Sequence, residues 1–209
     1  MTPMASPTAY SSPRLGLRER KKIRTRQAIR KAAYRLFEEQ GYDGTTVEQI
    51  AEAAEVSPST VFRYFPTKED IVLTDEYDPM MIAALKDRPA DEPLIESLRQ
   101  AVLEPLREMI ETEREEILQR MRLVRAVPAI RARQAEQMYD SGTALGEALA
   151  ERAGRPANDL EIRVLIGALM GAWTEAIYRW ADDDGREDLA TVLDRAVGVL
   201  SSNMCRHRI

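Results

Sequence analysis

The spacing of apolar residues predicts that the chain is helical almost throughout. Between Ile29 and Phe37 apolar residues recur at intervals of three and four, which is the period of one face of an α-helix. We therefore expect a helix over residues 18–40. Gly41 follows it and can adopt the left-handed backbone conformation that often ends helices. No segment alternates apolar and polar residues in a way that indicates a strand.

A second, short helix is predicted after a brief loop. Val47, Ile50 and Ala51 share one face of it. Thr45 or Thr46 can cap its start, because a hydroxyl oxygen at that position accepts a hydrogen bond from a backbone N–H group that has no partner within the helix.

Ser57 and Pro58 mark the start of a third short helix, as its N-cap and its first helical residue. Val61 and Phe65 fall on its inward face, and Pro66 ends it. Two short helices joined by a turn of three or four residues have the proportions of a helix-turn-helix, whose second helix enters the major groove of DNA. The pattern therefore favours a DNA-binding domain.

The outward face of the third helix carries residues suited to reading bases. At about 100° per residue, Phe62 and Arg63 lie opposite the inward face. Arginine can bind the edge of a guanine with two hydrogen bonds, and an exposed aromatic ring can contact a thymine methyl group. We therefore expect both side chains to face the groove.

Charge is divided unevenly along the chain. The net charge is −5, but residues 1–70 carry twelve Lys and Arg against nine Asp and Glu, whereas residues 71–209 carry eighteen against twenty-six. Nine basic residues lie between Arg18 and Arg35, with Glu19 as the one acidic residue among them. Such a segment can be an exposed helix surface, but it also suits phosphate or minor-groove contact. We favour DNA contact by Arg20, Lys21, Arg24 and Arg26.

Several classes of function are poorly supported. One cysteine, Cys205, and one histidine, His207, argue against a disulfide framework, a zinc site or a catalytic triad. No phosphate-binding loop, nucleophile elbow or dinucleotide-binding motif occurs, so we expect neither an enzyme nor a cofactor. Without a signal peptide or a long apolar run, the chain is expected to be cytoplasmic, with no membrane contact. Cys205 beside Arg206 could sense oxidants, although an incidental thiol at a frayed terminus is favoured.

The segment from Thr45 to Asp70, preceded by Ala33 to Gly41, closely resembles the DNA-binding domain of the TetR family. The resemblance implies contacts with phosphates or bases for the matching positions on and after the third helix. Phe62 departs from the family's usual tyrosine, so its contact would have to be apolar. The candidate DNA-binding residues are Arg20, Lys21, Arg24, Arg26, Thr45, Thr46, Ser57, Ser59, Thr60, Phe62, Arg63, Tyr64 and Lys68.

The C-terminal part suggests a ligand site. Residues 114–133 hold six arginines among apolar side chains, and the segment from Arg120 to Pro128 resembles, more loosely, a TetR subgroup associated with acyl-CoA-like ligands. The alternative is that these arginines pair with nearby glutamates on solvated faces. The candidate ligand-binding residues are Arg120, Met121, Val124, Met138, Met170, Trp173 and Ile177.

The last two long helices suggest a dimer interface. Small side chains at Val164, Ala168, Gly171 and Ala172 would let two helices approach closely, and a reader of a two-fold operator needs a dimer. The alternative is that these faces belong to the intramolecular core. Resemblance to the family supports dimerisation through these two helices.

Together these patterns predict an all-α protein with a disordered tail over residues 1–17, a helix-turn-helix domain over 18–74, and a helical effector-binding and dimerisation domain over 75–209. We expect a homodimeric, sequence-specific transcriptional regulator: a repressor released from a palindromic operator in double-stranded DNA by a small amphipathic or hydrophobic effector. The alternative is a helical binding or adaptor protein without specific DNA contact, which would show no salt-dependent DNA binding.

Overall fold

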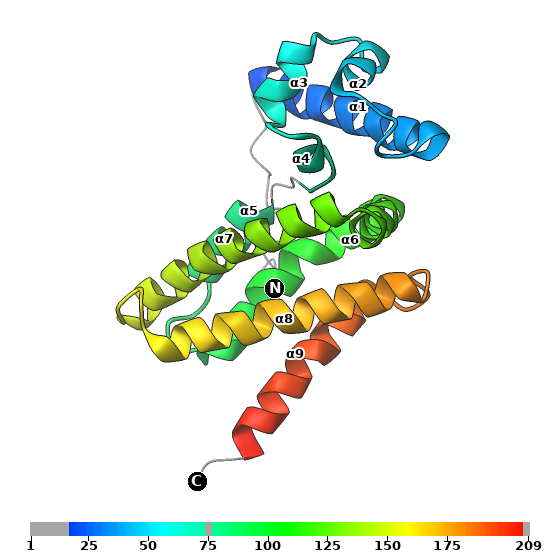
Figure 1. Ribbon diagram of the computed structural model, residues 1–209. Coiled ribbons are helices and arrows are strands. Elements are labelled where there is room, and N and C mark those ends of the chain that lie inside the picture. Colours follow the sequence, from blue (N-terminus) through cyan, green and yellow to red (C-terminus); the bar gives the residue numbers. More distant parts are fainter. Residues whose placement is uncertain (1–16, 74–76, 207–209) are drawn as a thin grey trace, which may run out of the picture. The chain divides into compact units, whose positions relative to one another are not determined.

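The computed structural model describes residues 17–73 and 77–206. Within these ranges every regular element is a helix, as predicted (Figure 1). Residues 1–16 of the expected tail lie outside the described residues. His207 and the side chain of Cys205 lie outside them as well. The helices are α1 (Leu17–Gln40), α2 (Val47–Ala53), α3 (Pro58–Tyr64), α4 (Lys68–Leu73), α5 (Tyr77–Lys86), α6 (Leu94–Ala126), α7 (Pro128–Ala153), α8 (Leu160–Asp182) and α9 (Leu189–Arg206).

The chain divides into two compact units between Pro66 and Thr67. The first contains α1 to α3 and the second α4 to α9. The boundary predicted after residue 74 assigns α4 to the N-terminal domain, whereas in the structure α4 belongs to the second unit. In the structure α4 packs against α7 and α6, and Asp70 of α4 accepts hydrogen bonds from Arg133 and Gln137 of α7.

In the first unit α2 packs against both α1 and α3. Ile29 and Ala33 of α1, Ile50 of α2 and Val61 of α3 are almost completely buried. Gly41 ends α1 with φ +78°, in the predicted left-handed conformation. These contacts fix the positions of α2 and α3, which have seven residues each and are too short to be stable alone, against α1.

The turn between α2 and α3 is strained at Glu55, which has φ +54°. The Val56 N–H donates to Ala51 O at 2.9 Å and the Glu55 N–H donates to Glu52 O at 3.0 Å. This is the Schellman arrangement, which places glycine at the position that Glu55 occupies. Glutamate is strained there because its Cβ crowds the backbone.

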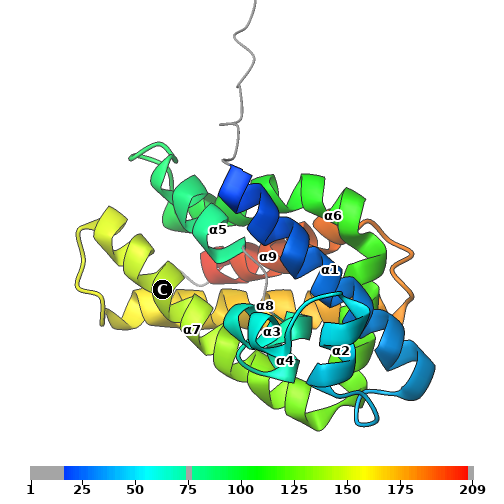
Figure 2. The same ribbon diagram turned by 90° about the horizontal axis from the view of Figure 1, so that it is seen from above.

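In the second unit, the chain turns sharply at both ends of α8 (Figures 1 and 2). At its C-terminal corner the Trp180 indole N–H donates to Glu187 O at 2.9 Å, and Arg114 of α6 donates to Gly185 O at 2.8 Å. Gly185 has φ +65°, and a Cβ there would lie 2.8 Å from the Trp180 ring. Glycine is therefore needed at this corner, which sets the direction of α9.

Across the part of the chain that the structure describes, no helix is both long enough and apolar enough to cross a membrane.

Replacing Glu55 by glycine should stabilise the protein. We expect Glu55→Gly to raise the free energy of unfolding of the first unit by about 1 kcal/mol, because glycine adopts positive φ without steric cost. Glu52→Gly, inside α2, is the matched control and should lower it by about 1 kcal/mol. Urea denaturation followed by circular dichroism measures both. Equal effects of the two substitutions would contradict the strain at Glu55.

Candidate DNA-binding face and ligand cavity

Helix α3 is held at both ends by local interactions. The Ser57 hydroxyl accepts a hydrogen bond from the Thr60 N–H at 3.2 Å, and Pro58 occupies the first helical position. The Ser57 hydroxyl also lies 2.9 Å from the hydroxyls of Ser59 and Thr60. At the other end the buried Phe65 N–H donates to Val61 O at 2.8 Å. The helix therefore has a defined start and a fixed inner face.

The outer face of α3 brings several predicted residues together. Phe62 is 48% exposed, which is unusual for so large an apolar side chain, and Arg63 and Ser59 are exposed beside it. The Arg63 guanidinium lies 5.2 Å from the centre of the Tyr64 ring. Thr60 and Tyr64 are half-buried at the edge of this face.

The two threonines before α2 have structural roles. Thr45 is buried, and its hydroxyl donates to Gly41 O at 2.8 Å. Thr46 is the N-cap of α2: its hydroxyl accepts from the Gln49 N–H at 3.2 Å, while the Gln49 side chain accepts from the Thr46 N–H at 2.9 Å. Burial therefore removes the Thr45 side chain from the surface that a DNA contact would need.

The predicted basic residues differ in placement. Arg20, Lys21 and Arg24 are exposed on α1, whereas Arg26 is half-buried with its guanidinium 5.2 Å from the centre of the Phe65 ring. Lys68 begins α4 and belongs to the second unit.

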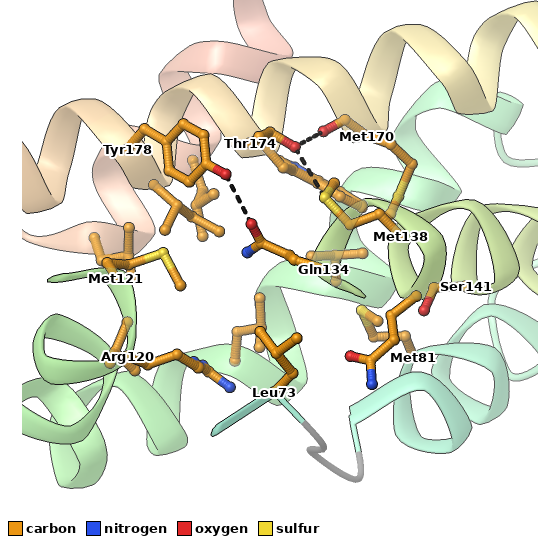
Figure 3. A pocket seen from close by; sticks show the side chains of 18 of the residues that line it. Leu73, Met81, Arg120, Met121, Gln134, Met138, Ser141, Met170, Thr174 and Tyr178 are labelled. Atoms are coloured by element: carbon orange, nitrogen blue, oxygen red, sulfur yellow. Dashed lines mark hydrogen bonds between the residues drawn. The ribbon is translucent and has the colours of Figure 1, made fainter. Parts of the chain in front are cut away.

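A cavity of about 420 Å³ lies inside the second unit (Figure 3). Each of the helices α4 to α9 contributes to its lining, and most of the lining side chains are apolar. Figure 3 shows Tyr178 of α8 and Gln134 of α7 pointing toward each other, and the Tyr178 hydroxyl donates to Gln134 Oε1 at 2.7 Å. A largely apolar cavity with a few polar groups is typical of a small-molecule site.

Six of the seven predicted ligand-binding residues line this cavity: Arg120, Met121, Met138, Met170, Trp173 and Ile177. Val124 does not line it, because its side chain is fully buried between helices. Other lining residues were not predicted from the sequence, among them Leu73, Met81, Leu189 and Leu193 on α4, α5 and α9, and Gln134 and Gln137 on α7. No local motif marks them, since only the packing of six helices brings them together.

A buried carboxylate, Asp70, lies near one wall of the cavity. It accepts hydrogen bonds from Arg133 Nε at 3.0 Å and from Gln137 Nε2 at 3.2 Å. The carboxylates of Glu136 and Asp70, in that order of effect, raise the pKa of Arg133 above its ordinary value. The Arg133 guanidinium therefore stays charged and available to Asp70.

Apolar side chains remain exposed on α8 and α9. Leu160 and Val164 of α8 are 74% and 58% exposed, and Val199 of α9 is 55% exposed. Gly167 and Gly171 lie on the same side of α8, with open space where a Cβ would stand. An exposed apolar stripe with small residues is suited to close packing against another helix.

Two family models match the chain. One, described as bacterial regulatory proteins of the tetR family, matches residues 29–74, and the other, described as the MftR C-terminal domain, matches residues 92–204. The first covers the helix-turn-helix, and the second covers α6 to α8 and most of α9.

Individual proteins are similar over most of their length. The HTH-type transcriptional regulator TcmR of Streptomyces glaucescens is 37% identical over 162 residues, which cover 74% of this chain and 72% of that protein. The HTH-type transcriptional repressor AcnR of Corynebacterium diphtheriae is 30% identical over 171 residues, covering 81% and 87%. Among solved structures, the TetR-family repressor FadR of Thermus thermophilus, in complex with lauroyl-CoA, has a TM-score of 0.53 at 27% identity, covering 84% of this chain and 92% of that one.

Taken with the capped helix-turn-helix, these matches show that the chain belongs to the TetR family of bacterial regulatory proteins and is a DNA-binding transcriptional regulator.

Proposed function

We propose that the chain acts as a homodimeric repressor that binds a palindromic operator through α3 and leaves it when a small amphipathic or hydrophobic molecule occupies the cavity. The observation that carries the DNA-binding part is the outer face of α3, where Arg63 and a half-exposed Phe62 project from a helix held at both ends. The cavity in the second unit carries the ligand-binding part.

At the operator, Arg63 binds a guanine edge and Phe62 contacts a thymine methyl group. Ser59 shares this face, and Arg20, Lys21 and Arg24 supply exposed positive charge for phosphates. Thr46 and Ser57 act as helix caps, so their contribution is to orient α2 and α3. Thr60 and Tyr64, half-buried beside Arg63, act at the edge of the interface.

The dimer forms through the exposed stripe on α8 and the neighbouring face of α9. Two recognition helices must lie about 34 Å apart to enter successive major grooves. A pair of chains related by a two-fold axis presents two copies of α3 to a palindromic operator, and an interface on α8 would cover Leu160 and Val164, which are exposed in one chain.

The effector is an amphipathic molecule of the acyl-CoA type. Apolar side chains of α6, α8 and α9 suit an acyl chain, and Arg120 places a positive charge in the cavity lining. The similarity to the Thermus thermophilus repressor, whose structure holds lauroyl-CoA, supports this class.

Arg63→Ala tests the proposed function. We expect the variant to lose about 1–3 kcal/mol of preference for the operator over unrelated DNA, because it loses two hydrogen bonds to one base. Binding of the purified protein to its own upstream DNA, measured across a salt series, provides both affinities. Arg35→Ala removes the same charge from α1 and should keep the preference. A preference unchanged by Arg63→Ala would count against base reading by α3.

Val164→Arg should dissociate the dimer. A charge placed at the centre of an apolar interface loses its hydration, so we expect dimerisation to weaken roughly 100-fold. Tyr139→Arg, at an exposed position on α7, is the matched control and should remain dimeric. Sedimentation equilibrium measures both. If both variants associate as the unmodified chain does, α8 is not the interface.

Filling the cavity should weaken ligand binding. Met170→Trp adds bulk to the lining, and we expect lauroyl-CoA to bind about tenfold more weakly because overpacking costs about 1–3 kcal/mol. Met80→Trp makes the same change at an exposed position outside the lining and should not alter the affinity. Isothermal titration calorimetry gives both dissociation constants. The same affinity in both variants would show that lauroyl-CoA does not occupy this cavity.

A further inference from the structure

Asp70 is a buried charge in the first turn of the six-residue helix α4. Its side chain is 2% exposed. Asp70 Oδ2 accepts from the Thr67 N–H at 3.0 Å, and the Asp70 N–H donates to the Thr67 hydroxyl at 3.2 Å. This reciprocal pair defines the start of α4. It leaves Oδ1 to be satisfied from another helix.

The donors to Oδ1 come from α7. Arg133 Nε lies 3.0 Å from it and Gln137 Nε2 lies 3.2 Å from it. A carboxylate removed from water is tolerated only when its oxygens are hydrogen-bonded. The position of α4 on α7 therefore depends on these two side chains.

Gln137 is also part of the cavity lining. It is thus shared between the surface that a ligand would touch and the carboxylate that holds α4. Leu73, at the other end of α4, lines the same cavity and is labelled in Figure 3. Helix α4 is therefore connected to the cavity at two places, through Leu73 itself and through the bond from Gln137 to Asp70.

We propose that Gln137 couples occupancy of the cavity to α4: a ligand that hydrogen-bonds to the Gln137 amide or displaces it withdraws one of the two α7 donors from Asp70. The coupling rests on the proposed function. A loss of this hydrogen bond weakens the hold of α7 on α4, and α4 follows the helix-turn-helix unit directly in the sequence. Gln137 is a positioning residue in this scheme, since it acts on the DNA-binding unit through Asp70.

Gln134 provides a matched comparison. It lies one turn earlier on α7, is the same residue type and lines the same cavity. Its side chain accepts a hydrogen bond from the Tyr178 hydroxyl of α8, and among the described residues it makes none to α4. Gln134→Leu and Gln137→Leu therefore remove equal polar surface from one wall, and only Gln137→Leu removes a donor from Asp70.

The first measurement is amide hydrogen exchange of the full-length chain without ligand. In Gln137→Leu the amides of Val72 and Leu73 should exchange about tenfold faster than in the unmodified chain, because Asp70 has lost a hydrogen bond to its charge. Gln137→Glu, which places a second carboxylate beside Asp70, should increase exchange further. Gln134→Leu should leave α4 exchange as it is. Equal α4 exchange in Gln134→Leu and Gln137→Leu would overturn the proposal.

The second measurement is the ratio of DNA dissociation constants with and without saturating lauroyl-CoA. Saturation makes the ratio independent of ligand affinity, and allosteric ratios are typically about 5–150. In Gln137→Leu the two DNA dissociation constants, with and without lauroyl-CoA, should differ by no more than about twofold. An unchanged ratio in that variant would overturn the coupling. If the unmodified chain itself shows a ratio of one, the proposed ligand class is wrong, and exchange in α4 then decides alone whether Gln137 holds this helix.

Discussion

The position of α4 in the second unit depends on the buried carboxylate of Asp70 and on the hydrogen bonds that it accepts. A charged group that has lost water must find its donors within the protein. Here they are the N–H of Thr67, just before α4, and the side chains of Arg133 and Gln137 of α7. A helix of six residues has little stability of its own. Its position is therefore decided by this carboxylate and by the burial of Ile71, Val72 and Leu73.

The DNA-binding unit achieves order by a different means. Helices α2 and α3 are short. Hydroxyl caps at Thr46 and Ser57 define where they begin, and the Schellman turn at Glu55 ends α2. Because these local hydrogen bonds hold the helices, α3 does not need the side chains on its outer face for its own stability. Phe62 and Arg63 can therefore project from a rigid helix, which is the arrangement that base reading requires.

The cavity places polar groups on a mainly apolar lining. Gln134 accepts a hydrogen bond from Tyr178 of α8, whereas Gln137 donates one to Asp70 of α4. Two glutamines one turn apart on α7 therefore connect the same cavity wall to different helices. A ligand that touches this wall thus meets one side chain tied to α8 and another tied to α4. The difference between them is set by tertiary partners and not by residue type.

The sequence by itself determined the helical class, the helix-turn-helix, the cap at Ser57 and the outward face with Phe62 and Arg63, because these depend on interactions within a few residues. It left Thr45 and Thr46 as alternative caps of α2, and the structure shows that Thr46 is the cap. Only the tertiary structure decided that Thr45 is buried, that Arg26 packs on Phe65, that Val124 lies outside the cavity and that α4 joins α7. Each of these outcomes depends on contacts between residues far apart in the chain, which periodicity and capping patterns do not encode.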